Sequence, residues 1–597
     1  MGKVLSAGIA GFLFFVLSSE FVLAQTAPND PRLSERSLPS AVADSSEQSG
    51  FLSSSALSCA YSTEQFSDVI SSGENSDTAF EISNFVYTRV DASPAAAKFE
   101  KLLNLELKQY VGRKTDISGL QAIAVQAQCV LRANGNLLSA VVVPPQKISR
   151  VGSDVRLNII SGYVSNIDYV YKGSRLADNV EATGLKGAEK RAVKRVMTQF
   201  NKLLGEAYED DEALARAVLL ASRIPGVSVR PSLKKGESGE AGSVNLSVDI
   251  FDFDAYRGDV TLLNYSPEEL GRWGPLLQLS ANSQLLPGDQ FRVSAYSSTD
   301  FSSQNVVRAN YDAYLGDSDA VLGLYGSYGT AEPSDELSEI EVETESLVLG
   351  GRISYPWKIG TRFQINVYGG AEIIEQNLDV VGARISNDKL SIGFAGVEGL
   401  INRGRFSSSY NFEVRQGFSV FGASEDGEAD ISRIGADPQA IVFRGNLDSQ
   451  ININRNIKFN SRISGQFSDD PLLAYEEYTV GNFTVGRGNE PGLLSGDSAI
   501  GGAFDLVAGP FPLSKDPSSG LNIKVSPYVF YDVVEVWNED QFSEDNRTLA
   551  SRGAGIKIDL TDNFSADITY ADARKRVFEL SDEAPGDTVL VRTSFRF

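Results

Sequence analysis

Histidine is absent from the 597 residues of this chain, and only two cysteines occur. Without histidine the chain lacks the commonest general base, the commonest metal ligand and the base of the usual serine and cysteine triads. The two cysteines, Cys59 and Cys129, are too few for a structural zinc site or a disulfide scaffold. We therefore expect no enzyme activity, no metal site and no cofactor.

Basic residues are outnumbered, with 54 Lys and Arg against 78 Asp and Glu and a formal net charge of -24. Such a chain would be repelled by phosphate backbones, so we expect no nucleic-acid partner. Apolar runs of about twenty residues are also lacking, which excludes a transmembrane helix after the N-terminal region. The length exceeds what one compact core serves and predicts two or more units.

The N-terminal residues 1–24 have the pattern of a secretory signal peptide. Lys3 supplies a positive charge, residues 4–17 are apolar, and a short small-residue stretch ends at Ala24. A buried helix or a membrane anchor is the alternative reading. Residues 25–77 are rich in Ser, Ala, Pro, Asp and Glu and predict a linker.

Residues 78–163 and 164–253 repeat one order of elements: strand, helix, helix, strand, strand. In the first unit "FEISNFVYTRV" alternates like a strand, and "SPAAAKFEKLLNLELKQYVG" has helical spacing. The second unit follows the same order at a similar length, which indicates an internal duplication of a small α+β domain. An exposed edge strand of such a domain can bind an extended peptide by β-addition.

Residues 254–597 show no helical pattern. About sixteen segments of roughly 10 to 13 residues alternate between apolar and polar side chains, with Gly, Asn, Asp, Ser and Pro between them. A membrane strand needs about 9 to 11 residues, and the intervening turns alternate between short and long. The pattern predicts a membrane β-barrel. Acidic runs such as 335–347 and 423–433 are expected to be solvated outer loops.

The last segment, "DTVLVRTSFRF", separates two faces. Val589, Val591, Thr593, Phe595 and Phe597 share one face, and three polar residues share the other. An apolar row towards lipid and a polar row towards a wet lumen fit this spacing, although an ordinary edge strand is the alternative. The aromatic Phe595 and Phe597 resemble the recognition signal that barrel assembly machinery reads in bacterial outer-membrane proteins.

Four stretches carry a family resemblance. They are "VVVPPQKI" (141–148), "LASRIPGVSVRPSLKKGESGEAGSVNLSVDI" (220–250), "TVGRGNEPGLLSGD" (484–497) and "PYVFYDVVEV" (527–536). The chain resembles the two-partner secretion transporters of the haemolysin secretion/activation type, which belong to the barrels that carry periplasmic POTRA domains. The resemblance implies two small α+β POTRA domains, 78–163 and 164–253, before a membrane β-barrel over 254–597 in the bacterial outer membrane.

The resemblance also implies a site. Residues 469–498 would fold back into the barrel lumen, with Arg487 between Gly486 and Gly488 at the tip and its partner Asp532 on the thirteenth strand. A buried arginine needs such a partner, and glycines allow tight turns. The chain departs from the family pattern at three positions: Gly486 stands before the arginine, Asn489 replaces an aromatic residue, and Val534 replaces a glycine. A surface loop with a solvated arginine is the alternative.

Other residues follow from the same resemblance. Substrate contacts are expected at Pro144, Pro145 and Gln146 in the first domain and at Pro225 in the second. Cys59 and Cys129 would pair in the oxidising periplasm, or they are two unpaired small hydrophobic residues. An N-terminal helix plugs the pore in many family members, but residues 25–77 show no clear amphipathic helix.

The implied function is secretion of a large β-helical partner protein through the barrel without ATP, after POTRA domains recognise it. Outer-membrane lipid, lipopolysaccharide and the barrel assembly machinery are the other expected partners. The alternatives are an insertase that helps other barrels into the membrane, which usually carries more POTRA domains, and a passive porin, which needs none.

Overall fold

The computed structural model describes residues 78–597 apart from the gaps 90–94, 134–137, 139, 150–151, 161, 178–180, 182, 205–210, 237–239, 241, 334–340, 517–520, 540–546 and 575–585. The expected signal peptide and linker, Cys59 included, lie outside the described residues. The chain divides into two compact units whose main boundary lies between Asp254 and Ala255, with Ile359–Thr361 grouped with the first of them. Among the described helices none is long and apolar enough to cross a membrane.

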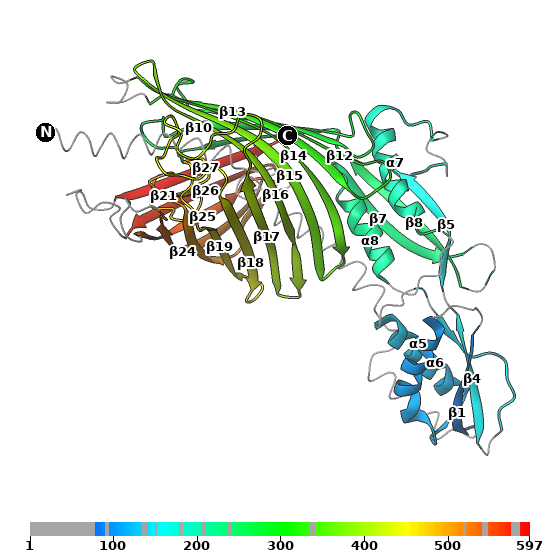
Figure 1. Cartoon of the computed structure of the whole chain (residues 1–597). Coiled ribbons are helices and arrows are strands. Elements are labelled where there is room, and N and C mark those ends of the chain that lie inside the picture. The colour runs from blue at the N-terminus through cyan, green and yellow to red at the C-terminus, as the bar shows by residue number, and fades with distance from the viewer. Residues whose placement is uncertain are drawn as a thin grey trace. The chain divides into compact units, whose positions relative to one another are not determined.

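The first α+β domain has the predicted order of elements, with short additions. Its elements are β1 (Phe80–Arg89), α5 (Ala95–Leu107), η1 (Lys108–Tyr110), β2 (Lys114–Thr115), α6 (Ile117–Ala133), β3 (Ala140–Val142) and β4 (Ser153–Ile160). The sheet order is β2-β1-β4-β3, with β1 parallel to β4, and α5 and α6 lie beside these strands (Figure 1). Asp116 begins α6, because its Oδ1 accepts a hydrogen bond from the Gly119 N–H at 2.9 Å.

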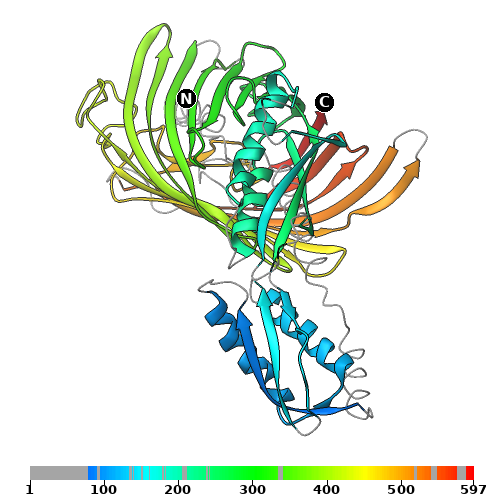
Figure 2. The same ribbon diagram turned by 90° about the vertical axis from the view of Figure 1, so that its right-hand side faces the viewer.

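The second domain repeats this arrangement. Its elements are β5 (Tyr163–Tyr171), β6 (Ser174–Arg175), α7 (Gly187–Asn201), α8 (Asp211–Ser222), β7 (Val227–Lys235) and β8 (Ser243–Phe253). The sheet order is β6-β5-β8-β7 and β5 runs parallel to β8. Figure 2 shows the two helices against these strands. The same order of strand pairing in both domains agrees with the duplication read from the sequence.

One predicted strand is shorter than expected. The strand expected after the second helix, read from the sequence as 138–148, is limited in the structure to β3, Ala140–Val142. Pro144 and Pro145 lack the N–H groups that would extend the ladder. Beyond them Gln146 replaces a strand residue: its Nε2 donates to the Arg156 carbonyl at 2.9 Å, and its Oε1 accepts from the Arg156 N–H at 2.8 Å.

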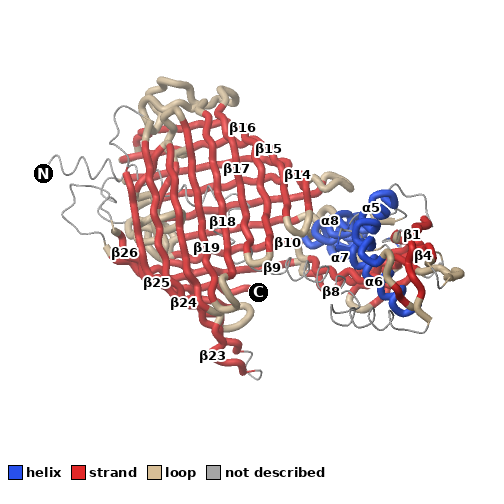
Figure 3. Tube along the Cα trace, turned by 90° about the horizontal axis from the view of Figure 1, so that it is seen from below, coloured by secondary structure: helices blue, strands red, loops and turns tan. Residues whose placement is uncertain are grey.

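Within the described residues, sixteen antiparallel strands close into a barrel, as predicted. They are β9 (Tyr256–Leu263), β10 (Gly274–Asn282), β11 (Gln290–Ser297), β12 (Gln304–Tyr314), β13 (Val321–Ala331), β14 (Val342–Ile359), β15 (Phe363–Val380), β16 (Ala383–Arg403), β17 (Phe406–Gly417), β18 (Ile441–Asn452), β19 (Ile457–Ser468), β22 (Ser498–Ala508), β24 (Leu521–Trp537), β25 (Arg547–Asp559), β26 (Phe564–Ala573) and β27 (Asp587–Arg596). A short strand, β23 (Phe511–Asp516), extends the hairpin of β22 and β24 past the barrel rim (Figure 3).

Several strands are longer than the predicted segments. β14 and β15 have 18 residues each and β16 has 21, whereas a membrane crossing needs about 9 to 11. β16 pairs with β17 only from Ile392 onward, so its first part, 383–391, projects past that neighbouring strand, and only Val381 and Gly382 separate it from β15. The acidic run 335–347 is therefore not a loop throughout, since β14 begins at Val342.

The barrel closes where β27 pairs with β9. Gly258 and Phe597 exchange two backbone hydrogen bonds of 2.9 Å. A Cβ on Gly258 would lie 2.3 Å from the Phe597 ring, so this ring occupies the place of the missing side chain. Phe595 and Phe597 are both exposed and stack on one another at 6.2 Å. The terminal strand thus has an apolar outer face, while its role as an assembly signal stays a prediction.

Candidate functional site

Residues 469–497, here called the lumen loop, connect β19 to β22, the eleventh and twelfth strands of the barrel. The loop carries a small hairpin of its own, β20 (Tyr478–Val480) paired with β21 (Leu494–Gly496). Its side chains contact β17, β18, β22 and β24 as well as the loop between β9 and β10. A single loop reaches wall positions that far apart only from inside the barrel. The loop therefore lies in the lumen.

The tip of this loop is held by Arg487. Its Nε and its backbone N–H each donate to Asp532 Oδ2 at 2.9 Å, and its Nη2 donates to Asp532 Oδ1 at 2.6 Å. Nη2 also reaches Asp505 on β22 at 2.7 Å. Asp532 on β24 is fully buried. The structure thus brings Arg487 and Asp532 together in a bidentate contact of the strong, directional kind.

The charge on Arg487 is stabilised by its surroundings. Burial disfavours the guanidinium cation, but Asp532 and Asp505 raise the pKa of Arg487 above its ordinary value. The guanidinium carbon also stands 3.8 Å from the centre of the Phe530 ring, which adds a cation–π contact. We call Arg487, Asp532 and Asp505 the tip site. The tip site combines one cation with two carboxylate partners.

The glycines beside Arg487 serve two different needs. Gly486 has φ +110°, a backbone conformation that other residues rarely adopt. Gly488 lies against the wall: a Cβ there would stand 2.9 Å from the Ala573 nitrogen and 3.0 Å from the Ser551 Cβ. Asn489 is buried and its N–H donates to the Gly486 carbonyl at 2.9 Å, closing the turn. The loop therefore makes a tight turn at its tip and lies directly against the barrel wall.

A second ionic cluster holds the loop nearer its start. Glu476 accepts from Arg415 on β17 at 3.0 Å and from Arg444 on β18 at 3.1 Å. Arg415 also contacts Glu372 and Glu413, so the cluster continues along the wall. Burial of Glu476 opposes ionisation, but the two arginines lower the pKa of its carboxyl below the usual value. The loop is therefore anchored by an ionised carboxylate at this point.

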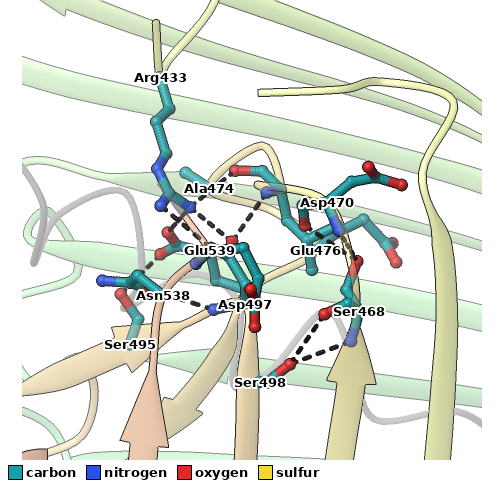
Figure 4. A network of polar contacts seen from close by, with 12 residues as sticks. Arg433, Ser468, Asp470, Ala474, Glu476, Ser495, Asp497, Ser498, Asn538 and Glu539 are labelled. Carbon is teal, nitrogen blue, oxygen red and sulfur yellow. Dashed lines mark hydrogen bonds and ion pairs between the residues drawn. The ribbon is translucent and has the colours of Figure 1, made fainter. Parts of the chain in front are cut away.

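A third cluster, here called the outer site, consists of Arg433, Glu477 and Asp497; Figure 4 labels Arg433 and Asp497. Asp497 ends the lumen loop and is completely buried. Its two carboxylate oxygens accept from Arg433 at 2.5 and 3.1 Å, and Glu477 accepts from Arg433 at 2.8 Å. Arg433 belongs to residues 418–440, the loop between β17 and β18. The lumen loop is thus tied to another loop as well as to the wall.

The remaining predicted residues lie in the α+β domains. Pro144 and Pro145 follow β3, and Pro225 lies in the turn between α8 and β7. Gln146 uses its carboxamide to pair with β4, as described above. Cys129 on α6 is disulfide-bonded; its expected partner Cys59 lies outside the described residues, so this pairing stays a prediction. Among the described residues no group of His, Cys, Asp or Glu is arranged to hold a metal ion.

The sequence did not single out Arg433, Glu476 or Asp505. Asp497 ends the stretch 484–497 that carried the family resemblance, so its position was noticed but its partner was not. The run 423–433 was expected to be a solvated loop, whereas Ile431 and Arg433 within it are buried. The available signal for burial was Ile431, a hydrophobic residue that follows the acidic residues of this run and precedes Arg433 by two positions.

Comparison with known proteins agrees with this architecture. The chain is similar to the heme/hemopexin transporter protein HuxB of Haemophilus influenzae, with 22% identity over 479 residues, 78% of this chain and 79% of the relative. CdiB from Escherichia coli has a similar structure, with a TM-score of 0.70 and 16% identity, covering 96% of this chain and 99% of that one. CdiB from Acinetobacter baumannii has a TM-score of 0.61 and 14% identity, covering 87% and 91%.

A closed barrel with an occupied lumen, on a chain that also carries two POTRA domains, defines an outer-membrane transporter of the two-partner secretion class, with its POTRA domains in the periplasm. The family model described as haemolysin secretion/activation protein ShlB/FhaC/HecB matches residues 243–558. The chain belongs to this family. A secreted protein is accordingly its partner.

Proposed function

We propose that this transporter recognises an unfolded, exported, β-helical partner protein through its POTRA domains and passes it through the barrel as an extended chain, without ATP. The observation that carries the proposal is the lumen loop, which lies inside the barrel and is held to its wall by the tip site. Because the contacts are ionic rather than covalent, the loop can leave its place without bond cleavage. Folding of the partner outside would prevent its return.

The first POTRA domain offers the more accessible sheet edge for the partner. Among the described residues, no strand pairs with the free side of β1 after Ile82. The counterpart of β1 in the second domain is β5, which pairs with β6 at Val170 and Tyr171 and forms a bridge from Val164 to Leu204. The outer strand β7 of that domain carries Pro231 and Lys234. Proline and lysine on an edge strand discourage pairing with another chain. We therefore assign β-addition of the partner to β1.

Crosslinking tests this assignment. A photoreactive side chain at the exposed Thr88 of β1 is expected to crosslink to the secretion domain of the partner in periplasmic extracts. The matched control is the same side chain at the exposed Ser232 of β7, where no crosslink is expected. Equal crosslinking at both positions, or crosslinking only at Ser232, would place recognition elsewhere than on β1.

Nucleotide independence is tested with the whole chain in proteoliposomes that contain no ATP. The partner's secretion domain, added on the POTRA side, is expected to become protected from protease added on that same side. Protection that appears only with ATP would contradict the mechanism. If the partner is untouched while newly made barrels assemble faster, the chain is an insertase instead.

We infer that the tip site holds the loop in its working position and has no catalytic part. Outer-membrane lipid and lipopolysaccharide surround the barrel, where apolar side chains such as Phe412, Val529 and Val589 are exposed on its outer face. The barrel assembly machinery is the expected partner for insertion of the terminal strand with Phe595 and Phe597.

A further inference from the structure

Residues 418–440, here called the outer loop, lie folded against the projecting part of β16. The Phe418 N–H donates to the Ser391 carbonyl and the Ser424 N–H to the Lys389 carbonyl, both at 2.8 Å. Further along, Asp388 accepts from the Ser432 N–H at 2.8 Å. Three attachments over this length mean that the outer loop has one defined position on the projecting part of β16.

From this wall the outer loop reaches the lumen loop. Ile431 and Ala436 of the outer loop share a buried apolar cluster with Leu473 and Tyr475 of the lumen loop. The Asp437 N–H donates to the Pro471 carbonyl at 2.8 Å. The two loops therefore form one packed unit in which neither can move outward without exposing apolar side chains of the other.

Arg433 supplies the ionic part of this contact. It is 9% exposed, whereas Glu477 and Asp497 are 1% and 0% exposed. Asp497 also accepts from the Leu472 N–H at 2.7 Å and from the Glu539 N–H at 2.8 Å; Figure 4 labels Asp497 and Glu539. Arg433 thus joins Glu477 and Asp497, the last residue of the lumen loop, to the outer loop, next to a further segment that follows β24.

The attachment of the lumen loop to the outer loop depends on the positive charge of Arg433. Two buried carboxylates, Glu477 and Asp497, lie on the same cation. Removal of one partner from a buried ion pair leaves an uncompensated charge, which is far more costly than losing an exposed pair. Without Arg433 the two carboxylates would repel one another, and solvation of both would favour movement of the lumen loop outward.

We propose that Arg433 is a positioning residue that keeps the outer end of the lumen loop closed, separately from the tip site, so that the resting pore is shut by two loops together. This rests on the proposed function as a transporter. The tip site fixes the loop to the wall at one end, and the outer site fixes it to the outer loop at the other. Passage of the partner requires release of both sites.

Conductance of the purified full chain in planar lipid bilayers, without any partner, tests the proposal. Arg433→Gln is expected to raise the open probability by about tenfold or more, which corresponds to ~1.4 kcal/mol. Arg433→Lys keeps the charge but loses the planar fork and should give an intermediate value. The matched control is Arg384→Gln, which removes an exposed arginine paired with Asp379 on the hairpin of β15 and β16. An open probability of Arg433→Gln equal to that of the parent and control would overturn the proposal.

Proteolysis of the outer loop gives a second readout. Glu425 and Glu428 are exposed in this loop and are cleavage sites for a glutamate-specific protease. In outer-membrane vesicles, Arg433→Gln is expected to be cut there several-fold faster than Arg384→Gln. Unchanged cleavage would mean that Arg433 does not hold the two loops together.

A folding defect is separated by heat-modifiable gel mobility, which reports the closed barrel. If Arg433→Gln does not assemble, Glu477→Gln replaces it: this variant keeps the contact between Arg433 and Asp497 and is expected to show a smaller rise in open probability. No rise there would also contradict the proposal. Failure of the transporter function would instead appear as unchanged secretion by tip-site variants, whatever the conductance of the Arg433 variants.

Discussion

The two ends of the lumen loop are held in opposite ways. At the tip, an arginine on the loop reaches carboxylates fixed on barrel strands, Asp532 and Asp505. At the outer end, carboxylates on the loop receive an arginine from another loop. Strands of a closed barrel have a fixed register, whereas loops are the parts of a fold that rearrange most readily. The tip site therefore fixes the position of the loop tip on the wall, whereas the outer site is a contact between two loops that can open and close.

The largest effect is expected at the tip, and it should be unequal between the two partners. Arg487→Ala leaves the fully buried Asp532 without a cation, a loss of about 3 to 5 kcal/mol in loop docking. Asp532→Asn should cost less, because Arg487 keeps Asp505 and is partly exposed. Protease protection of the loop in vesicles measures both. Equal losses would mean that Asp532 is not the group that depends on Arg487.

Substitution of glycine sharpens the same comparison sterically. Gly488→Ala pushes a methyl group against the wall at Ala573 and Ser551, for which we expect about 1 to 3 kcal/mol. Gly435→Ala in the outer loop meets open space but must keep φ +81°, which costs about 1 kcal/mol. Secretion should fall more for Gly488→Ala. A larger defect for Gly435→Ala would show that the tip has more space than this geometry allows.

Acidification tests the cluster around Glu476. Because the pKa of Glu476 is lowered in the docked loop, its contribution is present above the pKa of the released carboxyl and is lost as pH falls through the lowered value. Loop docking should therefore be constant from about pH 6 to 8 and weaken below about pH 4. Conductance recorded across this range measures it, with Glu476→Gln expected to lose the acid step. Tighter docking of the lumen loop at low pH would contradict this prediction.

The smallest effect is expected where the loop meets the segment between β9 and β10. Arg272 and Glu490 are 3.1 Å apart, but both are more than a third exposed. Solvent-exposed pairs contribute about 1 kcal/mol or less and weaken with salt. Arg272→Gln should leave secretion within about twofold of the parent. A loss as large as that of Arg487→Ala would mean that this exposed pair, rather than the tip site, carries the loop.

The sequence was sufficient for the features that depend on period and local composition. Alternation of apolar and polar residues predicted the barrel, and the repeated order of strands and helices predicted both α+β domains. The pairing of Arg487 with Asp532 was accessible because each sits in a recognisable stretch and a buried arginine requires a partner. The lengths of β14 to β16 were missed because strand residues beyond the membrane need not alternate as strictly as those that face lipid.

The outer site was missed for a different reason. Arg433 and Asp497 are 64 residues apart in sequence, and neither lies on a strand whose register could be counted. Their contact depends on two loops packing together through Ile431, Ala436 and Leu473, and loop packing has no periodic signature. An acidic run next to an arginine favours a solvated surface on composition alone. The burial of Arg433 and its contact with Asp497 therefore depend on tertiary packing.

Secretion by the Arg487→Ala variant tests the central claim most directly. The partner protein in the medium would be measured in cells that carry this chain and its secreted partner, and normalised to the amount of closed barrel by heat-modifiable gel mobility. Arg462→Ala, at a barrel-wall pair with Asp448, is the matched control. We predict that the variant barrel assembles, that secretion falls by about tenfold or more, and that the control secretes normally. Normal secretion by an assembled Arg487→Ala barrel would contradict the account.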